Sequence, residues 1–187
     1  MNKILFIDAS VRKESRTHKL AEYLMSRLDG EKTVVRLSDE YPCHLDAESL
    51  KLRQELIAKK DYSHPIFKFA KQFADCDTAV ICAPYWDLSF PAIFKEYIEN
   101  ICVSTVTFEY VNGIPQSLCN VKKVYYVTTA GGEIFANLGY DYVKVLFEAF
   151  FKVKEFHLIK AEHLDVIGAD AEKIIEGAKQ DIDALTD

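Results

Sequence analysis

Hydroxyl and guanidinium side chains gather near the N-terminus, and this combination is suited to holding a phosphate. They are Ser10, Arg12, Ser15, Arg16 and Thr17. Serine and threonine hydroxyls donate hydrogen bonds to phosphate oxygens, and arginine adds positive charge. The segment holds no glycine, which argues against the glycine-rich loops that bind dinucleotides or nucleoside triphosphates. These residues therefore indicate a site for a terminal phosphate monoester. An ordinary strand-to-helix loop with Thr17 as the helix cap is the alternative.

Two further loops carry residues that could bind a flat organic ring. The first offers an aromatic wall held between two prolines, and its candidate binding residues are Pro84, Tyr85, Trp86, Asp87 and Leu88. The second offers backbone N–H groups that its paired glycines leave uncovered, and its candidates are Thr129, Ala130, Gly131 and Gly132. A hydrophobic turn that plugs the core and an ordinary glycine turn are the alternatives for these two loops.

Each of the three loops follows a run of apolar residues that is typical of a buried strand. The runs cover residues 3–8, 77–83 and 122–128, and two more strands are predicted at 33–37 and 155–161. Segments with apolar residues at helical spacing alternate with these strands. They lie near residues 20–28, 47–60, 64–73, 91–101, 140–151 and 170–185. Residues 105–110 precede the turn signal Asn112-Gly113, which predicts a small β excursion.

The alternation of strands and helices predicts an α/β fold in one domain over residues 1–187. A repeated strand–helix order implies a parallel sheet that is covered by helices on both faces, with right-handed crossovers. Five strands in this order fit a flavodoxin-like doubly wound sheet with strand order 2-1-3-4-5, which binds ligands at the carboxyl ends of its strands. Because all three loops follow strands, we expect them to meet at that edge of the sheet.

The composition excludes several other classes of function. Twenty-three basic and 29 acidic residues give a net charge of −6, which attracts neither nucleic acid nor an anionic membrane. No apolar run approaches the ~20 residues that span a bilayer. The first apolar run reads as a core strand rather than a signal peptide, so we expect a cytoplasmic protein. The five cysteines form no cluster with metal-site spacing, so no metal is expected. His18 is expected at the exposed surface.

These motifs resemble those of the FMN-dependent NAD(P)H:quinone reductases and NADH-azoreductases, which are flavodoxin-like proteins. Ser10 and Ser15-Arg16-Thr17 are similar to that family's serine-rich first loop, and residues 84–91 match its second loop with both prolines in register. Thr129-Ala130-Gly131-Gly132 is similar to its third loop, and residues 107–115 resemble its excursion after the third helix. The resemblance covers nearly the whole chain.

The resemblance implies an enzyme that uses a flavin. FMN would be held without a covalent link by the candidate residues named above. NADH or NADPH would deliver a hydride to the flavin, and two electrons would then pass to a quinone or azo acceptor in a ping-pong cycle. Because the flavin carries the chemistry, no catalytic side chain is expected. The resemblance also implies a homodimer in which the partner subunit completes each active site.

Two positions depart from the family pattern. Asp87 stands where the family has asparagine, and an ionised carboxylate cannot donate a hydrogen bond to a flavin carbonyl as an amide can. Ala130 stands where the family has arginine, so one positive group near the flavin is missing. Two alternatives therefore stay open. The protein could be an electron carrier of the flavodoxin type, or a flavodoxin-fold binding or scaffold protein that has lost its flavin.

Overall fold

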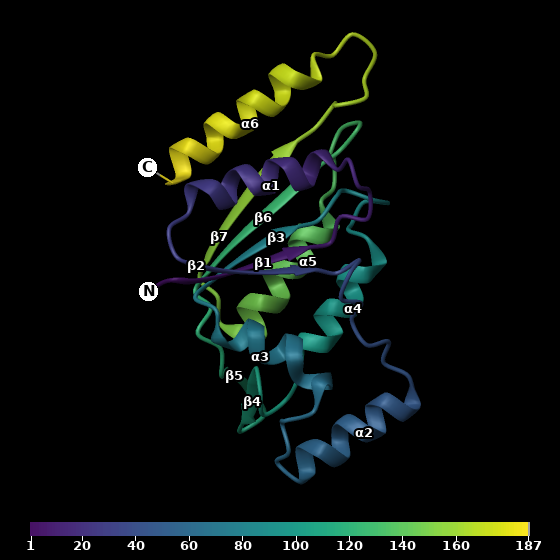
Figure 1. The fold of residues 1–187 in the computed structure, drawn as a ribbon, viewed down its shortest axis with the longest axis vertical. Helices are drawn as coiled ribbons and strands as arrows, with labels where there is room; N and C mark the ends of the chain where they lie inside the picture. Colours follow the sequence, from purple (N-terminus) through teal and green to yellow (C-terminus); the bar gives the residue numbers. More distant parts are fainter. Residues whose placement is uncertain (187) are drawn as a thin grey trace.

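Figure 1 shows the computed structural model, which describes residues 1–186 and has a parallel β-sheet at its centre. Every neighbouring pair of strands in this sheet is parallel. The strand order is β2 (Glu31–Arg36), β1 (Lys3–Asp8), β3 (Thr78–Cys82), β6 (Lys123–Thr129) and β7 (Glu155–Ala161). When only the strands of this sheet are counted along the chain, the order is 2-1-3-4-5. The predicted flavodoxin-like doubly wound sheet is therefore confirmed.

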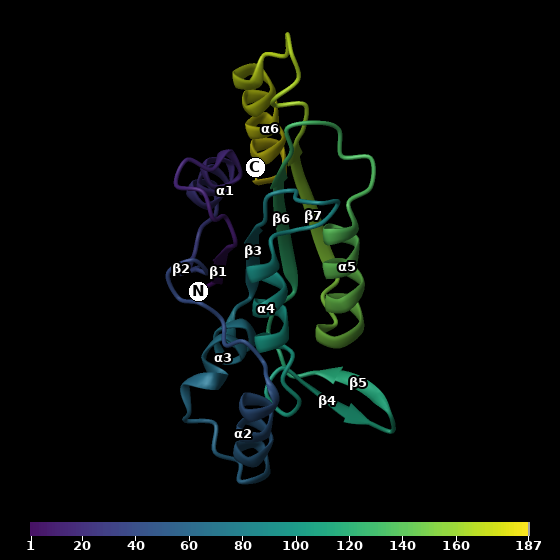
Figure 2. The same ribbon diagram turned by 90° about the vertical axis from the view of Figure 1, so that its right-hand side faces the viewer.

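Helices cover both faces of the sheet, as the view in Figure 2 shows. One face is covered by α1 (Arg16–Arg27) and α6 (Ala171–Thr186). The other face is covered by α3 (Lys68–Asp75), α4 (Ala92–Ile101) and α5 (Leu138–Leu146). In the described part of the chain, no helix is long and apolar enough to cross a membrane.

Side chains that point alternately to the two faces of the sheet fill two separate apolar cores. In β1, Ile4 and Phe6 pack in the core beneath α1 and α6, whereas Leu5 and Ile7 pack in the core beneath α3, α4 and α5. This division follows because successive side chains of a strand point to opposite faces. The helices on each face of the sheet cover its core with their apolar sides. In α1 this side consists of Thr17, Leu20, Ala21, Leu24 and Met25, which are all buried. The packing of this side holds the first turn of α1 against the sheet.

The two predicted helices between β2 and β3 differ in their detail from the structure. The first is α2 (Ala47–Ala58), which is capped by the Asp46 side chain but has no fully buried residue. The second begins as a 3-10 turn over Pro65–Phe67, with proline in its first position, and continues as α3. Proline fits a first turn because its missing N–H would have no partner there. The apolar spacing of α2 therefore indicates a helix correctly but overstates its burial.

The predicted helix at residues 140–151 is also divided in the structure. It is α5 followed by a π-helical turn over Phe147–Phe151, which ends where Lys152 adopts the left-handed conformation with φ 57°. The aromatic rings explain this turn in part, because Phe147 and Phe151 both pack on Phe73 of α3.

The predicted β excursion is a separate hairpin. Strands β4 (Phe108–Val111) and β5 (Ile114–Ser117) pair in the antiparallel direction. The turn between them is Asn112-Gly113, and both residues have positive φ, at 53° and 78°. Asparagine and glycine adopt this conformation readily, which explains why the pair favours a two-residue hairpin turn. The first strand of the hairpin begins three residues later than the predicted excursion.

Phe73 should be a large contributor to the stability of this fold. It is fully buried between α3 and the π-helical turn. We expect Phe73→Ala to lower the free energy of unfolding by about 3–5 kcal/mol, because it removes a buried ring and leaves a cavity. Urea unfolding followed by circular dichroism measures this change. Leu50→Ala on the exposed side of α2 is the control, and its effect should stay within about 0.5 kcal/mol. Equal effects of the two substitutions would contradict this account of the core.

Candidate active site

The loop after β1 is shaped by a buried carboxylate. Asp8 ends β1 and is fully buried, and its Oδ1 accepts hydrogen bonds from the N–H and the hydroxyl of Ser10, at 2.9 and 2.6 Å. The Ser10 hydroxyl therefore faces inward, and Ser10 does not lie on the wall of the cavity described below. The contact of Ser10 with a phosphate stays a prediction. In this structure its side chain fixes the loop.

The first turn of α1 offers unpaired backbone donors. Ser15 is the N-cap, because its side-chain oxygen accepts a hydrogen bond from the His18 N–H at 3.2 Å. Thr17 is therefore not the cap, contrary to the alternative interpretation of this loop. The N–H groups of Arg16 and Thr17 find no acceptor in the described part of the chain. Such N–H groups, together with the partial positive charge of a helix N-terminus, bind anions.

Thr129 joins all three loops at the carboxyl ends of the strands. Its hydroxyl shares a hydrogen bond of 2.6 Å with the hydroxyl of Thr17, and its carbonyl accepts a hydrogen bond from the Tyr85 N–H at 3.1 Å. The loops after β1, β3 and β6 are thus in direct contact, as their positions after the strands led us to expect.

The loop after β3 projects an aromatic side chain from a tight turn. Trp86 and Ser89 exchange two backbone hydrogen bonds of 3.1 and 2.8 Å around Asp87 and Leu88. Asp87 and Leu88 both have positive φ, at 50° and 65°, which is costly for residues other than glycine and asparagine. The turn is held from outside, because the Leu88 carbonyl accepts a hydrogen bond from the Leu138 N–H. Trp86 remains 38% exposed, so its ring can contact a ligand.

The loop after β6 packs against the loop after β7. The Ala130 N–H donates to the Ala161 carbonyl at 2.9 Å, and the Asp165 N–H donates to the Gly131 carbonyl at 2.9 Å. A side chain at Gly131 would overlap the Asp165 carboxylate and would have to displace that exposed side chain, so glycine fits this close approach best. The Ala130 N–H is therefore not available to a ligand, whereas the N–H groups of Gly131 and Gly132 have no acceptor within residues 1–186, and their contact with a ligand stays a prediction.

A cavity of about 260 Å³ lies where these loops meet. Most of the predicted residues line it, namely Arg12, Ser15, Arg16, Thr17, Pro84, Tyr85, Trp86, Thr129, Ala130 and Gly131. Ser10, Asp87, Leu88 and Gly132 are not on its wall. The structure thus brings together the phosphate-type donors and the aromatic wall that the sequence predicts.

Three residues of the wall were not predicted from the sequence, namely Val11, Glu14 and Asp165. Val11 and Glu14 belong to the first loop, but they have neither a donor nor a positive charge. Asp165 follows β7, the last strand of the sheet. Its position could have been predicted, because all parallel strands end at the same edge and the loop after β7 must pass there.

The charges around the cavity nearly balance. Arg16 forms an ion pair of 2.6 Å with Asp165, and its other terminal nitrogen donates to the Leu164 carbonyl at 3.0 Å. Arg12 has no ion pair within residues 1–186. Arg16 is therefore partly neutralised, which leaves Arg12 and the helix N-terminus as the free positive groups. A phosphate that approached Arg16 would have to compete with Asp165.

His18 corrects one expectation directly. It was expected at the exposed surface, but its side chain is only 14% exposed. The ring stacks on Phe6 with a centroid distance of 6.0 Å, and its Nδ1 lies 2.9 Å from Oδ2 of Asp8. His18 faces the sheet beside the first loop and is not on the cavity wall.

Comparison with known proteins agrees with this architecture. A family model described as "Flavodoxin-like fold" matches residues 2–185. A protein of Clostridium acetobutylicum named FMN-dependent NADH:quinone oxidoreductase 2 is 37% identical over 199 residues, covering 96% of this chain and 98% of the relative. A protein of Coprothermobacter proteolyticus named FMN-dependent NADH:quinone oxidoreductase is 34% identical over 200 residues, covering 99% and 98%.

Solved structures of low sequence identity share the fold. An azoreductase of Bacillus anthracis superposes with a TM-score of 0.84 at 20% identity, covering 100% of this chain and 99% of that chain. An FMN-dependent NADH-azoreductase of Bacillus anthracis in complex with FMN gives 0.82 at 18% identity, covering 99% and 98%. The resemblance drawn from the three loops is thus confirmed, and this chain belongs to the flavodoxin-like family that includes the FMN-dependent NADH:quinone oxidoreductases.

Proposed function

We propose that the protein is an FMN-dependent NADH:quinone oxidoreductase that binds its flavin in the cavity at the carboxyl ends of β1, β3 and β6. The observation that carries this proposal is the meeting of an anion-binding helix N-terminus with an aromatic wall in one cavity. The names of the relatives support FMN, NADH and a quinone as the reactants. Bound FMN would supply the hydride and electron chemistry, and the protein would supply binding and orientation.

The first loop suits the phosphate end of FMN. The unpaired N–H groups of Arg16 and Thr17 can donate to phosphate oxygens, and Ser15 can donate its hydroxyl hydrogen because the oxygen only accepts from His18. Arg12 adds a free positive charge nearby. Charge-assisted hydrogen bonds of this kind are about twice as strong as neutral ones. These contacts would fix one end of the cofactor against the sheet.

The second and third loops suit the ring. Pro84, Tyr85 and Trp86 form one wall, and Tyr85 is fixed because its hydroxyl donates to the Ala136 carbonyl at 2.8 Å. Asp87 lies off this wall, so its carboxylate need not face the flavin oxygens, which lessens the effect of replacing the family's asparagine. The electron-carrier and scaffold alternatives remain outcomes of the tests below.

We also propose that the protein is a homodimer whose partner covers α5. Leu138, Tyr142 and Val145 lie on one side of α5 at spacings of four and three residues, and Leu138 and Val145 are 55% and 67% exposed. Exposed apolar faces of this kind mark interaction surfaces. The cavity of about 260 Å³ is smaller than the ~300–1,000 Å³ of typical ligand pockets. A partner chain seated beside the second loop would complete it.

Binding of FMN should quench the fluorescence of Trp86, which is the single tryptophan. We expect saturable quenching at one FMN per chain, because the indole would lie against the flavin ring. The loaded protein should then consume NADH steadily when a quinone is present. Binding without NADH turnover would favour the electron-carrier alternative. Absence of bound FMN in equilibrium dialysis would favour the scaffold alternative and contradict the proposal.

Asp165→Asn should strengthen FMN binding. The substitution removes the carboxylate that competes with a phosphate for Arg16. The pair is partly exposed, so we expect a modest effect of roughly two- to fivefold in the dissociation constant. Riboflavin, which lacks the phosphate, is the matched control ligand and should bind the variant and the wild type equally. Weaker FMN binding, or an equal gain for riboflavin, would show that Arg16 does not contact the phosphate.

Val145→Asp should disrupt the proposed dimer, because it places a charge in an apolar interface. Light scattering should give twice the chain mass of 21.4 kDa for the wild type and the single chain mass for the variant. Leu52→Asp on the distant helix α2 is the control, and it should leave the mass unchanged. A monomeric wild type would contradict the proposed interface, and circular dichroism would verify that both variants fold.

A further inference from the structure

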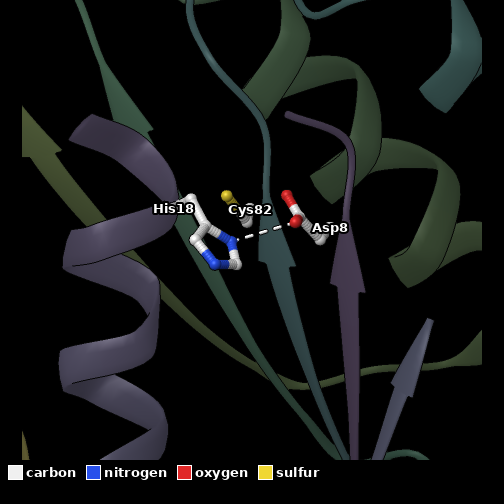
Figure 3. Close-up of side chains that lie close together, drawn as sticks. All are labelled: Asp8, His18 and Cys82. Atoms are coloured by element: carbon white, nitrogen blue, oxygen red, sulfur yellow. Dashed lines mark ion pairs between the residues drawn. The ribbon is translucent and has the colours of Figure 1, made fainter. Parts of the chain in front are cut away.

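Three side chains that can each bind a metal ion converge beside the first loop, and Figure 3 shows them together. Asp8 ends β1, Cys82 ends β3 and His18 lies in the first turn of α1. One ligand atom from each lies within 4.8 Å of the other two. The sequence predicts no such site, because these residues are far apart in the chain and only the fold brings them together.

The Nδ1 atom of His18 is a buried polar atom without a hydrogen bond. It lies 2.9 Å from Oδ2 of Asp8, but the two groups are not aligned for a hydrogen bond. A buried polar atom without a hydrogen bond is unfavourable. A cation held between the ring nitrogen, the carboxylate and the sulfur of Cys82 would interact favourably with all three.

Neighbouring side chains contact His18 and Asp8 in the way that the residues around known metal sites contact the metal ligands. The Nε2 atom of His18 lies 3.1 Å from Oε1 of Glu22, which is one helical turn further along α1. Histidines that bind metals almost always donate their second ring N–H to a carboxylate, a carbonyl or a water. Ser10 occupies Oδ1 of Asp8, which directs Oδ2 toward the cluster.

Arg36 of β2 is the positive group that faces the cluster in this structure. Its Nε donates to Oδ2 of Asp8 at 3.1 Å, and its Nη2 donates to Nε2 of His18 at 3.0 Å, which in this structure leaves the ring proton on Nδ1. A carboxylate oxygen has two lone pairs, so one arginine hydrogen bond leaves one pair for a metal. The Arg36 side chain is exposed for nearly half of its surface, and a metal at Nδ1 requires it to turn away from the ring so that Nε2 carries the proton and donates it to Glu22.

We propose that Asp8, His18 and Cys82 bind a zinc ion, with water as the fourth ligand. Zinc accepts carboxylate, imidazole and thiolate ligands together in tetrahedral geometry. Magnesium and calcium prefer oxygen ligands alone. A groove of about 590 Å³ that is lined in part by Phe6, His18 and Glu22 gives the ion a route from solvent.

Binding of the ion exchanges one proton. Burial raises the pKa of the Cys82 thiol well above its ordinary value, and the charge of Asp8 adds to this effect. The thiol therefore carries its proton until the zinc–sulfur bond forms, when the proton passes to solvent. The bound ion would clamp β1, β3 and α1 together next to the phosphate loop. This role does not depend on the proposed oxidoreductase activity.

Equilibrium dialysis of the purified protein against buffered zinc, followed by metal analysis, tests the site. We expect one zinc per chain, and X-ray absorption at the zinc edge should show one sulfur ligand. These readouts are independent of flavin and of turnover. Cys82→Ala should lose the sulfur signal and bind zinc at least 100-fold more weakly. Cys76→Ala, which changes another buried cysteine, is the matched control. It should retain both the sulfur signal and the zinc affinity of the wild type.

A second variant covers the case in which Cys82→Ala does not fold. Glu22→Gln changes a side chain that is 61% exposed, and it should fold normally. It removes the carboxylate that orients His18, so we expect zinc affinity to fall by roughly 10- to 100-fold. Absence of zinc from the wild type, a zinc site without sulfur, or unchanged affinity in Glu22→Gln would each overturn the proposal.

Discussion

The burial of the Asp8 carboxylate is the constraint on which the site depends. A buried charge is tolerated only where hydrogen bonds and opposite charges surround it. Ser10 supplies two hydrogen bonds, and Arg36 and His18 approach from β2 and α1. The first loop must therefore turn back toward the sheet immediately after β1. This turn places Ser15 at the start of α1 and leaves the next N–H groups free to face the cavity.

The other strand ends are linked to this first loop in a continuous series of hydrogen bonds. Thr17 contacts Thr129, Thr129 accepts from Tyr85, and Ala130 donates to Ala161 at the end of β7. Four strand ends are thereby held in one arrangement before any ligand arrives. Preorganisation of this kind reduces the entropy that is lost on binding. A ligand with a phosphate at one end and a flat ring at the other would bind donors and aromatic side chains that are already in position around the cavity.

The sequence alone predicts the order of the strands in the sheet and most of the residues that line the cavity. The βαβ alternation predicts the strand order, and the position of each polar loop after a strand predicts that the loops meet. Details that depend on contacts between distant residues were not predictable. Ser10 turns inward because Asp8 is buried, and His18 is mostly buried because it packs on Phe6 beside Asp8. The place of Asp165 at the cavity edge follows from its loop after β7, but its ion pair with Arg16 could not be predicted.

The turn at Asp87-Leu88 has a consequence for how this protein can change over time. Leu88 disfavours the left-handed backbone of this turn, so the hydrogen bonds between Trp86 and Ser89 and the one from the Leu138 N–H to the Leu88 carbonyl must maintain it. An Asn-Gly pair would adopt the same turn without strain and would make the chain more stable. It would also remove the leucine side chain and a charge beside Trp86. Because neither Asp87 nor Leu88 lines the cavity, this substitution would keep the wall that the present chain offers to a ligand, so the strain at the turn is stability that the protein could gain without changing that wall.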